Sequence, residues 1–532
     1  MRNATVARDF IFDKLFPSSQ GNLTADRLAP YDILVLVTPD YNYTSSEVST
    51  IIQWVNDGGS VFMAGEPGNG PFAKMTEQIN SIASSFGMSV NMDFSSGTAV
   101  VLDKASNIMT ESRYSHKLEA NPMFGYVNIT SPSAFPVWYS DGGIVIAASE
   151  ASAGRAILSA DMNWFTDSVI LTTDNLEYAI NIFNWLSSKD APVLLYVDDY
   201  YATNHYVAPV TQALNSLGIK FQLTSTAWGF NISRMNQTFD LAVVDAPTFS
   251  NVIDSLTQHI EGGGRAILST WNLDAIPDHR ILPLMGVKFG GTNLLDPVVY
   301  VWDSTSDVFN VPFDFGADSF TPNKLLYNDD GDTFHVLTNG TSLAGLSATP
   351  EENMSLMVLR SDGKTLVNGF LIAEMLSDED QSGFIDSYEL WVNEIAMFFP
   401  LSIDSPDDVT YDAGTSGHSI EWSVESGLVP GSYMIERNGS VVASGTWDGS
   451  SISLSIDGLD VGVYEFFITV TDYIGRTVTD TVLVTVLSST TGTTTTDTTG
   501  AGGDTSQLLI IAAVAGVLLL IVLVLVLKRR KS

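Results

Sequence analysis

Two stretches of the chain repeat one pattern of apolar and polar positions. In the first, an apolar run at 31–39 (YDILVLVTP) is followed by an amphipathic segment at 45–56, two glycines and a second apolar run at 60–64. In the second, apolar runs at 240–247 and 265–270 flank an amphipathic segment at 251–260 and three glycines. Buried strand, amphipathic helix, glycine cap and buried strand is the order of a right-handed βαβ unit.

Both stretches also end alike. Gly154-RAILSA leads to the apolar and aromatic segment 175–186, and Gly363-KTLVNGFLI leads to the similar segment 388–399. Each ending predicts a strand, a polar excursion and a closing helix with one apolar face. The duplication predicts two tandem α/β domains with mainly parallel sheets, at 1–189 and 190–401.

The first domain lacks one predicted element. The second opens with a buried strand at 193–197, whereas the first opens with a helix at 5–15 and no strand before it. A parallel sheet that lacks a strand exposes an unpaired edge. We therefore expect that the first domain is truncated at its N-terminus and that the missing strand and a signal peptide lie upstream of Met1.

The pattern changes to short alternating runs between about 405 and 486. Runs such as 419–424, 433–437 and 463–470 are separated by Gly, Asn and Asp turns every 8–12 residues. This spacing predicts an all-β, Ig-like sandwich at 402–487.

The C-terminal end predicts a membrane anchor. Residues 508–527 form an uncharged run of 20 residues, which as a helix would span about 30 Å, the hydrocarbon thickness of a bilayer. The basic tail 528–532 should stay cytoplasmic. The composition of the Thr/Gly-rich segment 488–507 predicts a flexible stalk. The sequence therefore predicts a single-pass cell-membrane protein that contacts the lipid bilayer through this helix, with the bulk of the chain extracellular and the C-terminus cytoplasmic.

Composition narrows the classes of function. The net charge of −37 argues against nucleic-acid partners, because a polyanion repels phosphates. The absence of cysteine excludes disulfides, thiolate nucleophiles and cysteine-ligated metals. Asn-x-Ser/Thr sequons are compatible with an extracellular glycoprotein. The glycosylation candidates are Asn22, Asn42, Asn128, Asn231, Asn236, Asn339, Asn353 and Asn438.

The strand and helix endings named above carry a resemblance to a known family. The runs YDILVLVTP, WVNDGG and GRAILSADMNWFTD resemble the class I glutamine-amidotransferase-like fold, in its non-catalytic branch that includes the GIFT-type domains of ciliary transport proteins. The resemblance implies a flavodoxin/amidotransferase-like fold over residues 1–400. It implies no amidotransferase activity, because the turns at 65–68 and 270–272 lack the cysteine of that family's enzymes. Residues 402–487 resemble Ig- or PKD-like modules of prokaryotic, in particular archaeal, surface proteins.

A calcium loop is the clearest chemical motif. Residues 378–389 (DEDQSGFIDSYE) have oxygen side chains at positions 1, 3 and 5, Gly at 6, Asp at 9 and Glu at 12. The template assigns the ligands to Asp378, Asp380, Ser382, the carbonyl of Phe384, Asp386 and Glu389. The alternative is an acidic turn in which Asp386 and Glu389 cap the closing helix. We expect Ca²⁺ to be a structural ion that locks this helix onto the second domain.

Motifs for catalysis are sparse. The six histidines form no HxH or HExxH pair, and no G-x-S-x-G elbow or phosphate-binding loop occurs. Ligands of parallel sheets bind beyond the carboxyl ends of the strands. This edge gives a possible ligand cleft, whose alternative interpretation is a set of helix caps and loop polar groups. The cleft residues would be Asp198, Asp199, His205, Asp245, Trp271 and Asn272.

The sequence therefore predicts a membrane-anchored, calcium-stabilised extracellular binding or scaffold protein without enzymatic activity, whose partner is an extracellular protein or glycan. One alternative is a carboxylate-based hydrolase of surface glycans or peptides, supported by the paired Asp198 and Asp199. Another is an accessory subunit of a membrane transport or export complex, which rests on the family resemblance.

Overall fold

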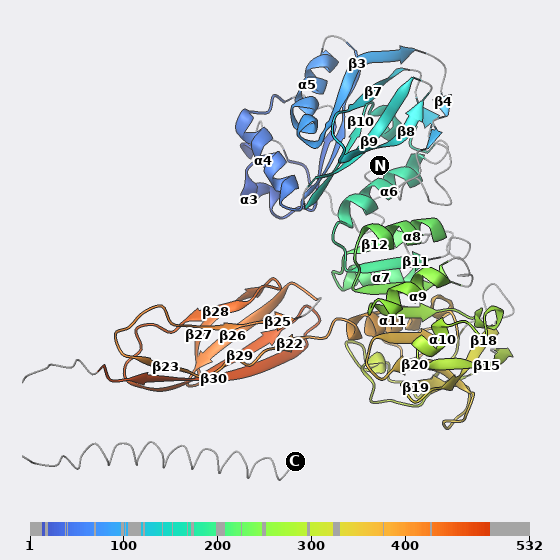
Figure 1. The fold of residues 1–532 in the computed structure, drawn as a ribbon, viewed down its shortest axis with the longest axis vertical. Coiled ribbons are helices and arrows are strands. Elements are labelled where there is room, and N and C mark those ends of the chain that lie inside the picture. Colours follow the sequence, from blue (N-terminus) through green and yellow to red (C-terminus); the bar gives the residue numbers. More distant parts are fainter. Residues whose placement is uncertain are drawn as a thin grey trace, which may run out of the picture.

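The computed structural model forms three successive units, two that combine helices with sheets and a third built from strands (Figure 1). It describes residues 13–15, 20–37, 39, 41–68, 71–96, 100–101, 103–104, 119–120, 123–140, 142–151, 153–166, 169–171, 175–197, 208–224, 226–246, 252–294, 298–322, 330–375, 377–425 and 428–489.

The first α/β unit has a mixed sheet in the order β1-β2-β10-β9-β8-β5. The first three strands pair in parallel, and the others pair antiparallel. The strands of this unit are β1 (Ile33–Val37), β2 (Ser60–Ala64), β3 (Met88–Ser96), β4 (Val100–Val101), β5 (Asp103–Lys104), β6 (Glu119–Ala120), β7 (Met123–Ile129), β8 (Ala134–Ser140), β9 (Gly143–Ala151) and β10 (Gly154–Ser159). Its helices are α3 (Ala25–Leu28), α4 (Ser45–Asn56), α5 (Pro71–Ala83), α6 (Asn175–Ser187) and the short 3₁₀ turns η1 (Ser84–Phe86) and η2 (Asn163–Phe165).

Local chemistry explains how α4 and β10 come together. Thr44 and Glu47 form a capping box, in which the Glu47 N–H donates to Thr44 Oγ1 at 3.2 Å and the Thr44 N–H donates to Glu47 Oε2 at 2.9 Å. At Gly154, which starts β10, a Cβ would lie 1.9 Å from the Val55 carbonyl oxygen of α4. Only glycine allows this close approach of helix and strand.

The second α/β unit has a larger mixed sheet. The strands β12, β11, β13, β14 and β21 pair in parallel in that order, and β20, β19, β16 and β17 continue the sheet antiparallel. The strands are β11 (Val193–Val197), β12 (Phe221–Thr224), β13 (Leu241–Asp245), β14 (Arg265–Ser269), β15 (Val287–Leu294), β16 (Val299–Val301), β17 (Ser319–Phe320), β18 (Asp330–Val336), β19 (Gly340–Gly345), β20 (Ser355–Arg360) and β21 (Thr365–Asn368). The helices are α7 (Pro209–Ser216), α8 (Ala227–Asn236), α9 (Ile253–Glu261), α10 (Ile281–Leu284), α11 (Asp386–Met397), η4 (Leu273–Ala275), η5 (Asp307–Phe309) and η6 (Ile372–Glu374).

The two α/β units share a detail at equivalent strand ends. After β2, the Gly65 N–H donates to the Ser159 carbonyl of β10 at 3.0 Å. After β14, the Thr270 N–H donates to the Asn368 carbonyl of β21 at 3.1 Å. In each unit, the strand that accepts this bond leads on to the closing helix, α6 or α11. The two closing helices therefore occupy equivalent places.

The third unit, which we call the β-sandwich, encloses one apolar core that includes the fully buried Trp422 and Trp447. The hairpin between β26 and β27 turns at Asn438 and Gly439, whose φ angles are 50° and 77°, as a two-residue hairpin loop requires. Its strands are β22 (Ser402–Ile403), β23 (Val409–Asp412), β24 (Ser419–Trp422), β25 (Val424–Glu425), β26 (Gly431–Arg437), β27 (Ser440–Trp447), β28 (Ile452–Ser455), β29 (Gly462–Thr471) and β30 (Thr477–Leu487).

The predicted fold class is corrected by these sheets. The chain is β-rich, and antiparallel strands make up much of both large sheets, so the prediction of two flavodoxin/amidotransferase-like domains with mainly parallel sheets is wrong. The antiparallel strands β8, β9, β19 and β20 lie in parts of the chain for which no strand was predicted from the sequence. Apolar periodicity predicts that a strand exists, but it does not give the direction in which the strand pairs.

The predicted membrane helix finds no counterpart in the part of the chain that the structure describes. None of the helices there is long and apolar enough to cross a membrane. The segments predicted as stalk, transmembrane helix and basic tail begin at 488, and all but their first two residues lie outside the described residues. The expected location of the chain at the cell surface stays a prediction.

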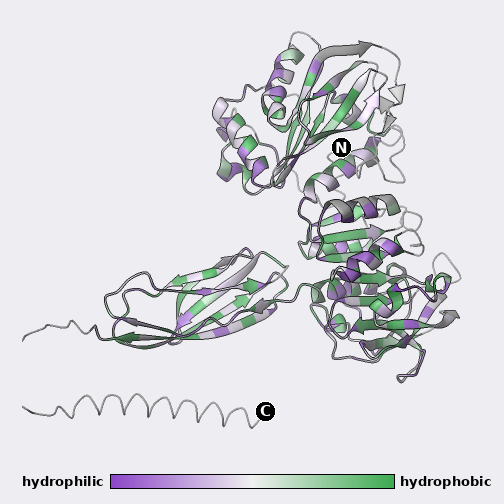
Figure 2. Cartoon of the chain, in the orientation of Figure 1, coloured by the Kyte–Doolittle hydropathy of each residue, from purple (hydrophilic) through white to green (hydrophobic). Residues whose placement is uncertain are grey.

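A polar seam joins the two α/β units. Arg155 at the start of β10 donates from Nη1 to the Trp185 carbonyl at 2.6 Å and to Ser188 Oγ at 3.0 Å. The Ser188 hydroxyl donates to Gln222 Oε1 of β12 at 2.6 Å, and both of these side chains are buried. Lys220 and Asp32 add an exposed ion pair at 3.0 Å. Apolar residues are concentrated in the strands on either side of this seam (Figure 2).

Candidate metal centre

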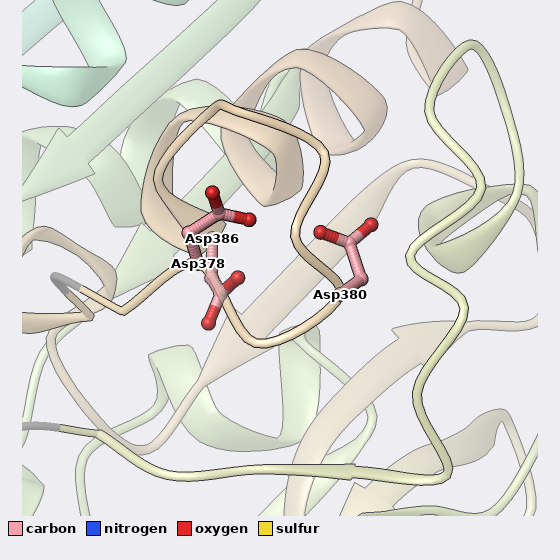
Figure 3. Close-up of side chains that lie close together, drawn as sticks. All are labelled: Asp378, Asp380 and Asp386. Carbon is pink, nitrogen blue, oxygen red and sulfur yellow. The ribbon is translucent and has the colours of Figure 1, made fainter.

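The predicted calcium loop lies between η6 and the start of α11. Figure 3 shows the carboxylates of Asp378, Asp380 and Asp386 gathered on this loop. One oxygen from each of the three lies within 4.8 Å of the others, a spacing that fits a single metal ion. The two residues at the loop entrance and the one at the helix start are thus brought together by the turn between them.

Backbone geometry closes the turn. Gly383 has a φ angle of 93° and donates its N–H to Asp378 Oδ2 at 3.1 Å. The Ser382 N–H donates to Asp380 Oδ1 at 2.9 Å, and the Phe384 N–H donates to Ser382 Oγ at 3.1 Å. Glycine is needed at this left-handed position because a Cβ would strain the backbone there. These bonds keep the oxygen side chains on the inner side of the loop.

Glu389 completes the set from the first turn of α11. Its side chain is buried, with 1% of its surface exposed, and among the described residues neither carboxylate oxygen has a hydrogen-bond partner. Burial is the largest of the causes that raise the pKa of Glu389 to about 7; the Ser382 hydroxyl opposes this shift, and the negative charges of Asp380, Asp386 and Asp378 contribute to it. A buried carboxylate without a donor is costly, and a bound cation would remove that cost.

Asp386 faces the loop and does not cap its own helix. Its Oδ2 accepts from Ser377 Oγ at 2.8 Å, and its Oδ1 accepts from the Glu379 N–H at 3.1 Å. The N-cap of α11 is Ile385, which makes no side-chain cap. Burial raises the pKa of Asp386 as well. The contacts of Asp386 therefore differ from those of the capping pair that was the alternative interpretation of this segment.

The donor set suits a hard cation. Carboxylates, a hydroxyl and a backbone carbonyl are the ligands that Ca²⁺ takes, six to eight at a time. Asp378, Asp380 and Asp386 form the cluster of carboxylates, and Glu389 approaches it from the helix. Ser382 belongs to the same turn, and the Phe384 ring is half exposed and stacks on Tyr388 at 5.5 Å between centroids.

The predicted ligand cleft is described only in part. Asp198, Asp199 and His205 lie outside the described residues. Asp245 ends β13 in register with Ser269 of β14, which is in turn in register with Asn368 of β21. Asp245 is only 3% exposed. Trp271 and Asn272 follow β14, where the Asn272 N–H donates to Thr270 Oγ1 at 3.3 Å.

The structure places a second carboxylate near Asp245 that was not predicted as a site residue from the sequence. Glu394 of α11 is fully buried, and Asn368 Nδ2 donates to its two oxygens at 3.0 and 3.1 Å. Burial raises the pKa of Glu394 well above its usual value, and the charge of Asp245 adds to this shift. No sequence motif joins residues 245, 368 and 394, since only the fold brings them together. Such closely buried carboxyl groups favour a protonated, structural role over a solvated cleft.

Two further buried carboxylates hold short helical turns. Asp161 accepts from the Asn163 N–H at 2.5 Å, and burial raises its pKa to about 7. Asp332 accepts from the N–H groups of Leu273 and Asp274, the latter at 3.1 Å, and burial raises its pKa to about 7. Both therefore anchor the loops that follow β10 and β14. Nothing in the sequence distinguishes them from the many exposed acidic residues.

The sequons differ in accessibility. Six of the predicted asparagines are exposed, whereas Asn231 is partly buried and its Oδ1 is enclosed without a hydrogen-bond partner among the described residues. The side chain of Asn236, at the end of α8, is outside the description. The exposed ones are Asn22, Asn42, Asn128, Asn339, Asn353 and Asn438. Glycosylation at these positions stays a prediction.

Comparison with known proteins gives one family match. Residues 14–101 match the family model described as the IFT52 GIFT domain, which covers part of the first α/β unit. A search of curated proteins found no match.

Several solved structures resemble parts of the chain. The N-terminal domain of mmIFT52 is 16% identical over 31% of this chain and 80% of its own, with a TM-score of 0.27. A cytoplasmic protein from Salmonella typhimurium LT2 is 13% identical over 31% of this chain and 75% of its own, with a TM-score of 0.26. Fibronectin(III)-like modules of Clostridium thermocellum CbhA are 21% identical over 16% of this chain and 96% of their own, with a TM-score of 0.14.

The family match corrects the resemblance drawn from the sequence. The family match is to the β-rich GIFT domain, so the assignment of tandem glutamine-amidotransferase-like domains is wrong. The short runs that carried it, such as YDILVLVTP, encode a buried strand and a turn, which many α/β sheets share. The matched family model stops before the antiparallel strands β8 and β9 of the first sheet.

Proposed function

We propose that this chain is a calcium-stabilised binding or scaffold protein that acts without catalysis. The observation that carries the proposal is the loop 378–389, where three carboxylates share one space and the buried Glu389 approaches them without a hydrogen-bond donor. The ion would neutralise these charges and fix the start of α11. A single loop of this type is expected to bind with a dissociation constant of about 10⁻⁴ to 10⁻³ M, the range of extracellular modules.

Three units in series suit a scaffold, because each offers a separate surface while the closing helices connect one unit to the next. The partner that we propose is an extracellular protein or glycan, as the sequence predicts. The hydrolase alternative gains no support from Asp245, since that side chain is buried beside Glu394.

A calcium titration of the full-length chain tests the proposal. We expect saturable binding by calorimetry, weaker binding of Mg²⁺, and a rise of the melting temperature with calcium. Asp380→Asn should abolish binding, whereas Asp407→Asn, an exposed position on the β-sandwich with the same charge change, should leave it intact. Equal calcium binding by the wild type and the Asp380→Asn variant would refute the site.

A further inference from the structure

Helix α11 connects the calcium loop to the β-sandwich. Its first turn carries Glu389, its last turn contains Ala396, and Phe399 follows two residues after the helix ends at Met397. Arg476 of the β-sandwich donates to both, from Nη1 to the Ala396 oxygen at 2.9 Å and from Nη2 to the Phe399 oxygen at 2.6 Å. The carbonyl end of a helix carries partial negative charge, so a guanidinium is a favourable partner there.

Arg476 is held rigidly by hydrogen bonds within the β-sandwich. Asp472, whose side chain is fully buried, accepts from Arg476 Nε at 2.8 Å and pairs with Nη2 at 2.7 Å. Its other oxygen accepts from the N–H groups of Arg476 at 2.9 Å and Ile474 at 3.2 Å. A planar guanidinium fixed along one edge presents its remaining donors in one direction. Arg476 can therefore bond to α11 only while the helix end stays in place.

Apolar contacts surround this polar contact. Leu428 of the β-sandwich is fully buried in the same core as Leu217, which follows α7, and Phe399, and Ile474 packs against that core. The β-sandwich therefore rests on the second α/β unit through the ends of α7 and α11. A shift of α11 along its axis would disturb these apolar contacts and the Arg476 hydrogen bonds together.

The other end of α11 depends on the charges in the calcium loop. Without an ion, Asp378, Asp380 and Asp386 hold like charges within 4.8 Å, next to the buried Glu389. Like charges at this distance repel, and the repulsion acts on the residues that begin the helix. Because side chains pack against nearly the whole length of α11, its start and its end move as one rigid element.

We propose that a divalent cation in the calcium loop fixes the orientation of the β-sandwich on the second α/β unit, with α11 as the connecting element and Arg476 as the contact. This inference rests on the proposed function and adds a regulatory consequence to it. The distribution of orientations of the β-sandwich relative to the second α/β unit would be narrow with calcium bound and broad without it.

Distance measurements between the two units test the inference. The chain contains no cysteine, so Ser304→Cys and Ser444→Cys, both at exposed positions, give one unique label on each unit. Pulsed spin-label distances on the full-length chain should show one narrow distribution with calcium and a broader one with a chelator. An unchanged distribution, with calcium binding measured on the same sample, overturns the inference and leaves the calcium site intact. Absence of calcium binding overturns both.

Two variants identify the contact. With calcium bound, Arg476→Leu should broaden the distance distribution as the chelator does. Because coupling is reciprocal, the same variant should weaken calcium binding by about fivefold or more. Arg437→Leu is the matched control, because it removes an arginine of the β-sandwich that lies over Tyr464 and should change neither quantity. A narrow distribution for folded Arg476→Leu, with wild-type calcium affinity, would contradict the role of Arg476; circular dichroism checks the folding of each variant.

Discussion

The helices that close the two α/β units, α6 and α11, occupy equivalent places but begin with different chemistry. At the start of α6, the fully buried Asn175 donates from Nδ2 to the Trp164 carbonyl at 3.3 Å and to the Val169 carbonyl at 3.4 Å. At the start of α11, Asp386 lies in a cluster of carboxylates. A neutral amide satisfies carbonyl groups by itself, whereas a carboxylate cluster needs a cation. The first unit therefore closes on its own, and the second is expected to close fully only with an ion.

Placing a carboxylate at the start of α6, as α11 has, should have the largest effect on stability. Asn175→Asp places a carboxylate against two carbonyl oxygens in a buried site, so we expect a loss of about 3–5 kcal/mol in the free energy of unfolding. Urea denaturation with and without calcium measures it, and the loss should be the same in both. A loss that calcium restores would mean that the first unit also holds an ion.

Removing the ion from the second unit should have the next largest effect. At a calcium concentration one hundred times the dissociation constant, the wild type should gain about 2.7 kcal/mol of stability relative to the chelated form. Asp378→Asn removes the carboxylate that accepts from Gly383 and should abolish that gain. The comparison of denaturation curves uses Asn175→Ala as a control, which should lower stability while leaving the calcium gain unchanged. Retention of the full gain by Asp378→Asn would contradict the ligand assignment.

The first unit should respond to pH through Asp161. Burial raises the pKa of this carboxyl to about 7, so the folded state keeps a proton that the unfolded state has already lost above its ordinary value of 3.8. The unfolded state therefore binds fewer protons between about pH 4 and pH 7, and stability should fall as the pH rises through this interval, by at most about 1.4 kcal/mol per pH unit. Denaturation curves recorded across this interval give the free energy of unfolding at each pH. This free energy should depend less steeply on pH for Asp161→Asn than for the wild type. Equal slopes for the two proteins would refute the shift.

The smallest effect is expected at Phe384. The calcium template uses only its backbone carbonyl, while its ring stacks on Tyr388 and meets Phe313 edge-on at 5.4 Å. Phe384→Ala should cost about 1 kcal/mol of stability through the lost aromatic contacts and leave calcium affinity unchanged. Calorimetry at matched pH checks both quantities. A large loss of affinity would mean that the ring, and not only the carbonyl, shapes the loop.

The sequence and the structure agree best where the chemistry is local. The spacing of Asp378, Asp380 and Asp386 around Gly383 can be read from twelve consecutive residues, and the structure places the three carboxylates together. The apolar runs likewise indicate β1, β2, β13 and β14. These features depend on neighbours along the chain.

Features that depend on tertiary contacts could not be predicted. The pairing direction of β8 and β9 depends on which edge of the sheet they reach, and the burial of Glu394 beside Asn368 joins helix and strand from different parts of the second unit. Arg476 has no distinguishing neighbour in the sequence, yet it contacts the end of α11 across a unit boundary. The resemblance to amidotransferases failed for the same reason, because it rested on local strand and turn residues.

The polar seam between the α/β units has a consequence for cooperativity. Ser188 of the first unit donates to Gln222 of the second, and both side chains, together with Arg155, are shielded from water. Separation of the units would exchange the Ser188–Gln222 bond for bonds to water, at a net cost of about 0.5–1.5 kcal/mol. Residues 20–401 should therefore melt in a single calorimetric transition, and a fragment that begins at Pro192 should melt at a lower temperature than the same residues within the whole chain.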